Sequence, residues 1–69
     1  MTNSSLLRQK IEECGFKLKY VAEQLNITPY TLQLKINNER EFKTGEVKKL
    51  CEILNITELS EREQIFFAS

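Results

Sequence analysis

The sequence predicts an all-α fold, a compact bundle of about five short helices, from three observations. Strong helix formers are abundant, whereas only two glycines and one proline occur among 69 residues. Apolar residues recur three and four positions apart in short segments. Each segment also begins or ends at residues that favour helix termini. A chain of this length buries only about 60% of its extended surface, so we expect one small domain, residues 1–69.

Composition narrows the class of protein. Ten basic and ten acidic residues cancel, but residues 1–43 hold seven Lys/Arg against five Glu, and residues 44–69 hold three against five. The N-terminal part is therefore weakly positive. No apolar run approaches the roughly 18 residues of a membrane span, so no membrane partner is expected. Two cysteines do not form a dense disulfide framework, and we expect a cytoplasmic protein with reduced thiols.

The first two helices are read from apolar spacing and helix stops. The segment "SSLLRQKIEECG" predicts a helix with Ser4 or Ser5 as N-cap and Gly15 as its stop. The segment "KLKYVAEQL" predicts a second helix of about two turns. Asn26 follows it, and Asn is common where a helix ends in a left-handed turn.

Pro29 decides how the middle of the chain is organised. Proline costs about 3 kcal/mol inside a helix but is harmless at the first helical position. Thr28 directly before it is a good N-cap. Pro29 therefore opens a third helix, residues 29–37, and the two helices joined by "NIT" form a helix-turn-helix over about residues 18–37.

Two further helices complete the chain. The segment "TGEVKKLCEILN" predicts a fourth helix capped by Thr44, ending at a second "NIT". The segment "SEREQIFF" predicts a short fifth helix in which Ser60 and Glu63 form a capping box. The apolar positions predicted to form the core are Leu7, Ile11, Val21, Ala22, Leu25, Ile27, Leu32, Ile36, Val47, Leu50 and Leu54, with Cys14 and Cys51 as buried thiols on the same faces.

The motif from Leu18 to Asn37 resembles the Cro/phage-repressor type, lambda-repressor-like helix-turn-helix domain. The small residue of the motif's fifth place is Ala22, and its apolar fourth, eighth, tenth and fifteenth places are Val21, Leu25, Ile27 and Leu32. The ninth place, often Gly, is Asn26. The ending "TLQLKINN" and the segment "LNITELSEREQIFF" resemble the close of the recognition helix and the C-terminal part of the family, so the likeness covers nearly the whole chain.

The resemblance implies a sequence-specific regulator of transcription, of phage or prophage type and acting as a repressor, that inserts helix 29–37 into the major groove of double-stranded DNA. Tyr30 then meets a thymine methyl group or a phosphate, Gln33 pairs with adenine, and Leu34 offers an apolar contact. The residues predicted to face the bases are Thr28, Pro29, Tyr30, Gln33, Leu34 and Asn37.

A second set of residues is predicted to contact the DNA backbone and so to position the protein on the duplex. Lysines at the start of the second helix reach one flank of the groove, and the start of the fourth helix offers a positive charge and free N–H groups. The predicted phosphate contacts are Lys17, Lys19, Thr31, Lys35, Asn38, Arg40, Lys43 and Thr44, with the Thr28 and Thr31 hydroxyls open to either role. Any single lysine is equally consistent with a solvated surface.

Other functions are less well supported. The zero net charge and the apolar Leu34 leave open a protein-interaction module that keeps the fold but has lost DNA binding. An enzyme or metal site is not expected, because the chain has no His and no Gly-rich phosphate loop. No cofactor or small-molecule ligand is expected. The partners are DNA and a second copy of the chain, through Ile65, Phe66 and Phe67, although Phe66 and Phe67 could instead cap the core.

Overall fold

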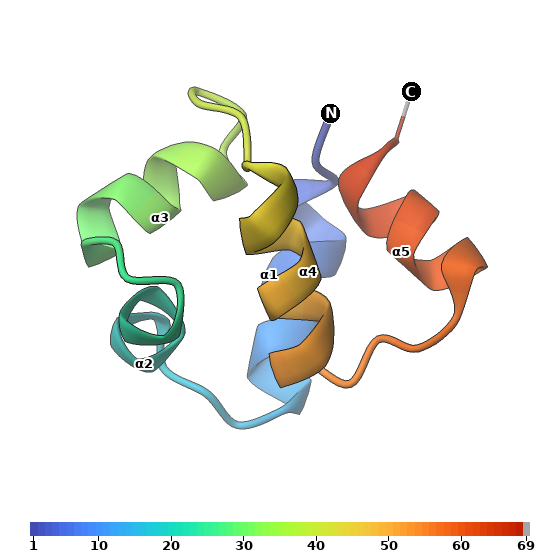
Figure 1. Ribbon diagram of the computed structural model, residues 1–69, viewed down its shortest axis with the longest axis horizontal. Coiled ribbons are helices and arrows are strands. Elements are labelled where there is room, and N and C mark those ends of the chain that lie inside the picture. The colour runs from blue at the N-terminus through green and yellow to red at the C-terminus, as the bar shows by residue number, and fades with distance from the viewer. Residues whose placement is uncertain (69) are drawn as a thin grey trace.

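The computed structural model describes residues 1–68. Within them the chain forms five helices and no strand (Figure 1). They are α1 (Ser4–Glu13), α2 (Leu18–Gln24), α3 (Pro29–Ile36), α4 (Thr44–Ile53) and α5 (Leu59–Phe66). α2 packs against α3 and α4, and α1 packs against α3 and α5. In Figure 1 the pair α2–α3 lies on one side of α1 and α4, and α5 lies on the other. The predicted all-α fold is confirmed.

One recurring local structure ends the first four helices. Gly15, Asn26, Asn38 and Asn55 all have positive φ, between 56° and 75°. In each case the next residue donates its N–H to a carbonyl five residues back, for example Phe16 to Ile11 and Ile27 to Ala22. These are Schellman endings, in which a left-handed residue satisfies the last carbonyls of a helix. The predicted stops at Gly15 and Asn26 are confirmed.

The helix starts agree less well with the predictions. Thr28 caps α3 as predicted, and its side chain accepts the N–H of Thr31. The cap of α1 is Asn3, not Ser4 or Ser5, because the Asn3 amide oxygen accepts the N–H of Leu6. The serines lie inside the first turn, where the Ser4 hydroxyl instead donates to the Ile36 carbonyl of α3.

The caps predicted for the last two helices are wrong. The N-cap of α4 is Lys43, and Thr44 is already the first helical residue. The Glu46 carboxylate accepts the Lys43 N–H at 2.8 Å, as the N3 residue of a capping box does, which places the N-cap at Lys43, one residue before Thr44. The N-cap of α5 is Glu58, so Ser60 lies within the helix and cannot cap it.

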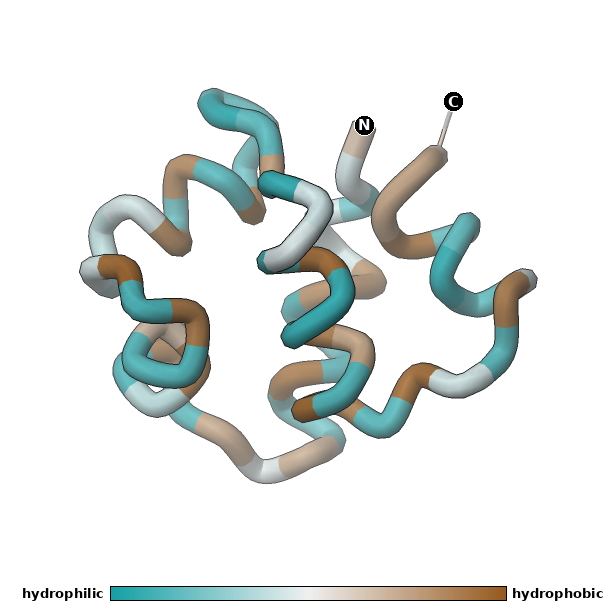
Figure 2. Tube along the Cα trace, viewed as in Figure 1, coloured by the Kyte–Doolittle hydropathy of each residue, from teal (hydrophilic) through white to brown (hydrophobic). Residues whose placement is uncertain are grey.

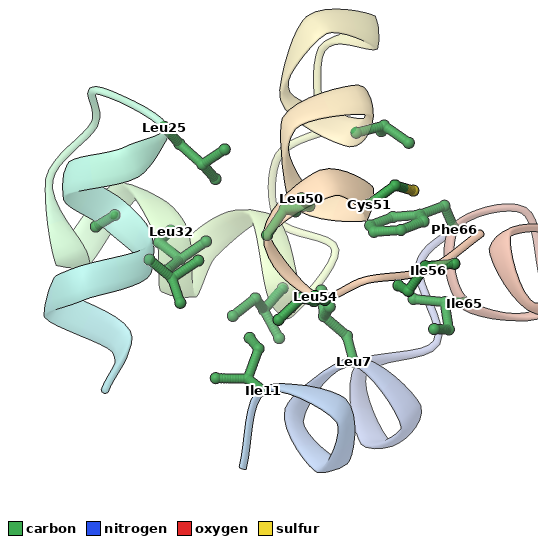
Figure 3. Packing of buried hydrophobic residues seen from close by; sticks show 14 residues of the cluster. Leu7, Ile11, Leu25, Leu32, Leu50, Cys51, Leu54, Ile56, Ile65 and Phe66 are labelled. Atoms are coloured by element: carbon green, nitrogen blue, oxygen red, sulfur yellow. The ribbon is translucent and has the colours of Figure 1, made fainter. Parts of the chain in front are cut away.

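The core is a single cluster to which every helix contributes (Figure 3). Its members are Leu7, Ile11, Val21, Ala22, Leu25, Leu32, Ile36, Val47, Leu50, Cys51, Leu54, Ile56, Ile65 and Phe66. The predicted core positions are confirmed except for Ile27, which is only partly buried. Along the chain these residues alternate with polar ones (Figure 2), the pattern of amphipathic helices rather than of one continuous apolar segment.

The two cysteines differ in their surroundings. Cys51 is buried in the core, and burial raises the pKa of its thiol. Cys14 is only partly buried, and its thiol donates weakly to the Leu54 carbonyl at 3.8 Å. The prediction of a buried thiol therefore holds for Cys51 and is wrong for Cys14.

The N-terminal residues are fixed between α3 and α5. The Asn3 N–H donates to the Ile65 carbonyl at 2.6 Å, and the Ala68 N–H donates to the Met1 carbonyl at 2.9 Å. The Asn38 amide accepts the Thr2 N–H and donates to the Thr2 carbonyl, both at 2.8 Å. The chain before α1 thus links the end of the third helix to the last helix, and in Figure 1 the N-terminus lies beside the end of α5.

None of the helices in residues 1–68 combines the length and the apolar character required to cross a membrane.

Candidate nucleic-acid interface

The third helix presents two different faces. On one face Thr28, Pro29, Tyr30 and Gln33 are exposed, and the Tyr30 side chain is 71% accessible. On the other face Leu32, Lys35 and Ile36, at positions i, i+3 and i+4, are buried. The face with Tyr30 and Gln33 is therefore free to contact a partner, and the face with Leu32 and Ile36 is packed into the protein.

The start of α3 is held rigid by its own cap. Thr28 Oγ1 accepts the Thr31 N–H at 3.1 Å and donates its proton to Thr31 Oγ1 at 2.9 Å. Pro29 has no N–H and a fixed φ, so it fits the first helical position without loss. Tyr30 and Gln33 are three residues apart and lie on the same side of the helix. The local sequence thus fixes the backbone from which both side chains project.

Two predicted base-facing residues are less available than expected. Leu34 is only half-exposed. Asn37 is exposed, but its amide oxygen accepts a hydrogen bond from the Arg8 guanidinium at 2.9 Å. Arg8 lies on α1, 29 residues away in sequence, so nothing in the local pattern indicated this contact. It places an exposed cation at the end of α3 that the sequence reasoning missed.

The prediction that Lys35 is exposed is wrong. The residue is 5% accessible, and its ammonium group contacts both carboxylate oxygens of Glu46, at 2.5 and 2.7 Å. The residue type hides this, although position 35 follows the buried Leu32 by three residues and so lies on the same face of the helix. Asn38, also predicted to hold the DNA backbone, has both amide atoms bound to Thr2.

Of the remaining predicted phosphate contacts, Thr31 is half-buried and its hydroxyl accepts the Thr28 proton, and the other five are exposed. Lys17 and Lys19 lie at the start of α2, Arg40 lies in the loop after α3, and Lys43 and Thr44 lie at the start of α4. Among residues 1–68 none of the four cations in this set takes part in an ion pair, since the two salt bridges are Lys10–Glu61 and Lys35–Glu46. The first turn of α4 also leaves backbone N–H groups without helical partners.

A shallow groove of about 320 Å³ separates the end of α2 from the start of α4. Gln24, Leu25 and Asn26 form one wall, and Lys43, Gly45, Glu46 and Lys49 form the other. Lys49 was not among the predicted phosphate contacts. It shares a helix face with Gly45, four residues earlier, and that spacing could have associated it with the start of α4.

The C-terminal region is the most acidic part of the chain. Helix α5 and the segment before it contain Glu58, Glu61 and Glu63 against Arg62 alone. In Figure 1 α5 lies on the opposite side of α1 and α4 from α2 and α3. Residues 17–46, which contain α2, α3 and the start of α4, hold five Lys/Arg against four Glu, so this face keeps a positive excess of one charge.

A comparison with protein families matches residues 6–61 to the Cro/C1-type HTH DNA-binding domain. The chain belongs to this family. The match includes all of α2 and α3 and extends from α1 into α5, so the resemblance seen in the motif holds for most of the chain. Membership indicates that this chain is a DNA-binding regulator with a helix-turn-helix domain. No curated protein and no solved structure matches the chain.

Proposed function

We propose that the chain is a sequence-specific transcriptional regulator of phage or prophage type, a repressor that inserts the start of α3 into the major groove. The observation that carries this proposal is the exposed face of α3, where Thr28, Pro29, Tyr30 and Gln33 lie opposite the buried Leu32, Lys35 and Ile36. In helix-turn-helix proteins the N-terminal residues of the recognition helix contact base edges. Here those are the residues that the fold leaves free.

Specificity would come from few side chains. Gln33 can bond to the N6 and N7 atoms of adenine with its amide, and the Tyr30 ring can contact a thymine methyl group or a phosphate. Thr28 and Pro29 complete the base-facing surface. Because one bidentate pair is worth about 1–3 kcal/mol, Gln33 is the residue whose loss should alter sequence preference most.

The exposed cations and the start of α4 would position the protein on the DNA backbone. Lys17 and Lys19 lie on one flank of α3, and Arg40 and Lys43 follow its end. Thr44 adds N–H groups at a helix N-terminus, where anions bind well. Such contacts fix the register of the protein on DNA without reading the sequence.

We propose that the regulator acts as a homodimer that binds two half-sites about one helical turn apart. Of the three residues suggested for the interface, Ile65 and Phe66 are 3% and 4% exposed and belong to the core. Phe66 packs edge-on against Phe42, with ring centroids 5.9 Å apart. Phe67 is 60% exposed and is the member of the set that remains available to a second copy.

The proposal is tested by selecting binding sites from random duplex DNA and measuring affinity by fluorescence anisotropy at low and moderate salt. We expect one enriched motif and affinity at least 1,000-fold above that for unrelated DNA, roughly the lower limit for specific regulators. Binding no tighter than to unrelated DNA, or clean flow-through on DNA-cellulose at physiological salt, would instead favour the protein-interaction module.

A matched pair of variants tests the reading helix. Gln33→Ala should relax the preference at one base pair, whereas Gln64→Ala, an exposed glutamine on α5, should leave the selected motif unchanged. Sequence preferences that stay identical in both variants would show that Gln33 does not read DNA.

A further inference from the structure

The ion pair between α3 and α4 is the more enclosed of the two salt bridges within residues 1–68. Lys35 Nζ contacts Glu46 Oε1 at 2.5 Å and Oε2 at 2.7 Å, and the two side chains are only 7% and 12% exposed. The other salt bridge within residues 1–68, Lys10–Glu61, is more open, with side-chain exposures of 24% and 38%. The geometry of Lys35 and Glu46 therefore depends little on solvent.

Glu46 holds two structural elements at once. Its Oε1 atom also accepts the N–H of Lys43, the residue that precedes α4, at 2.8 Å. Burial by itself raises the pKa of Glu46, but the hydrogen bonds from Lys35 and Lys43 and the charges of both lysines lower it overall. A single ionised carboxylate thus joins the last turn of α3 to the first turn of α4.

These two elements have different proposed roles on DNA. The start of α3 reads bases, and the start of α4 approaches the backbone through Lys43 and Thr44. Because both elements are bound through one carboxylate, their separation and relative angle are fixed before DNA arrives. Pre-formed geometry of this kind supports affinity by removing the cost of ordering on binding.

We propose that Lys35 and Glu46 are a positioning pair, which sets the separation and angle between α3 and the phosphate-facing start of α4. Lys35 itself contacts no phosphate. The inference rests on the proposed function. It also accounts for a carboxylate close to the proposed DNA surface. Alone, Glu46 would repel phosphates, but Lys35 neutralises it, and the exposed Lys43 and Lys49 line the same groove.

The first test separates a positioning role from direct contact with DNA. The double variant Lys35→Met/Glu46→Gln removes one positive and one negative charge, so the net charge of the protein does not change. Each phosphate contact contributes about 0.9 to the slope of log Kd against log salt. We expect the double variant to keep the wild-type slope and to bind the selected site about tenfold more weakly. Lys17→Met, an exposed lysine, should lower the slope by about 0.9.

The second test asks whether removing the negative charge of Glu46 strengthens or weakens DNA binding. Glu46→Gln removes a negative charge near DNA, which by Coulomb attraction alone would tighten binding. If the pair positions α3, this variant should instead bind the selected site more weakly while binding unrelated DNA at least as tightly as the wild type does. The matched control is Glu39→Gln, an exposed glutamate in the loop after α3, which should bind both DNAs slightly more tightly.

Partial unfolding is distinguished from mispositioning in the same data. A smaller folded fraction lowers affinity for selected and unrelated DNA by the same factor, whereas a displaced α3 lowers only the first. Circular dichroism at the assay temperature confirms that each variant is folded. Lys35→Arg keeps the charge that pairs with Glu46, so it should bind the selected site more tightly than the double variant does.

Two outcomes would overturn the inference while leaving the proposed function intact. One is a slope lower by about 0.9 in the double variant, which would make Lys35 a phosphate contact. The other is tighter or unchanged binding of the selected site by Glu46→Gln. Failure of the wild-type protein to select any site would overturn the proposed function, and the inference with it.

Discussion

The tripeptide Asn-Ile-Thr occurs twice in the chain, at residues 26–28 and 55–57, and the first half of each copy has the same structure. Asn26 and Asn55 are left-handed, with φ of 59° and 56°. Ile27 donates its N–H to the Ala22 carbonyl at 3.0 Å, and Ile56 donates to that of Cys51 at 2.8 Å. Both copies therefore end a helix by the same Schellman arrangement.

The copies diverge after the threonine. Thr28 is followed by Pro29, and its hydroxyl caps α3, which begins at once. Thr57 is followed by Glu58, which occupies the N-cap position of α5 without a side-chain cap bond. The first copy makes the tight corner of a helix-turn-helix, and the second makes a longer connection. Asn thus encodes where a helix stops, and the residues after it encode how soon the next one starts.

The isoleucines give the largest expected difference between the copies. Ile56 is 6% exposed and belongs to the core, whereas Ile27 is partly buried at the corner. Truncation of a buried Ile typically costs about 2–5 kcal/mol because the removed methyl groups leave a cavity. We expect Ile56→Ala to lower the free energy of unfolding by about 3 kcal/mol, and Ile27→Ala by about half as much. Urea denaturation measures both.

Equal losses would show that the two corners are packed alike and would contradict the burial difference. If Ile56→Ala is too unstable to purify, Ile56→Val should still cost about 1 kcal/mol, and Ile27→Val should cost less.

The asparagines should behave alike, because both copies end a helix in the same conformation. A left-handed backbone costs a residue with a Cβ and no helpful side chain about 1–2 kcal/mol. We expect Asn26→Ala and Asn55→Ala each to destabilise the protein by about 1 kcal/mol, and Asn26→Gly and Asn55→Gly to be neutral or slightly stabilising. Thermal unfolding followed by circular dichroism provides the comparison. A loss at one site alone would show that the shared φ does not control stability.

The features that the sequence predicted correctly depend on neighbours along the chain. Asn26, Thr28 and Pro29 act on the two helices that flank them, so the boundary between α2 and α3 follows from local rules. The apolar spacing likewise placed nearly all of the predicted core. The cap errors at α4 and α5 have a local origin too. Lys43 and Glu58 have no capping side chain, and Ser and Thr nearby offered better candidates.

The features that the sequence could not predict depend on contacts between distant residues. Lys35 is a surface residue by type, and only the arrival of Glu46 from α4 allows its burial. Asn38 meets Thr2 across 36 residues, and Asn37 meets Arg8 across 29. Ile65 and Phe66 were expected to be available to a partner because nothing local shows that the N-terminal segment and Phe42 cover the end of α5.

The threonines give a smaller expected difference than the isoleucines, and it is the one tied most closely to function. Loss of an N-cap hydroxyl costs about 1 kcal/mol, so Thr28→Ala should destabilise the protein by that amount, whereas Thr28→Ser should not. Thr57 is exposed and caps no helix, so Thr57→Ala should change stability by less than about 0.5 kcal/mol. Denaturant unfolding of all three variants measures these differences in the free energy of unfolding.

Binding data extend the threonine comparison to DNA. Without its cap the first turn of α3 is more mobile, and that turn carries Pro29 and Tyr30. Thr28→Ala should therefore weaken binding to the selected DNA site even at temperatures where the variant is fully folded, and Thr57→Ala should not. Weaker binding by Thr28→Ser as well, despite its retained cap, would indicate that the Thr28 methyl group contacts DNA directly. The cap and the contact are thus separable at a single residue, because serine keeps the hydroxyl and loses only the methyl.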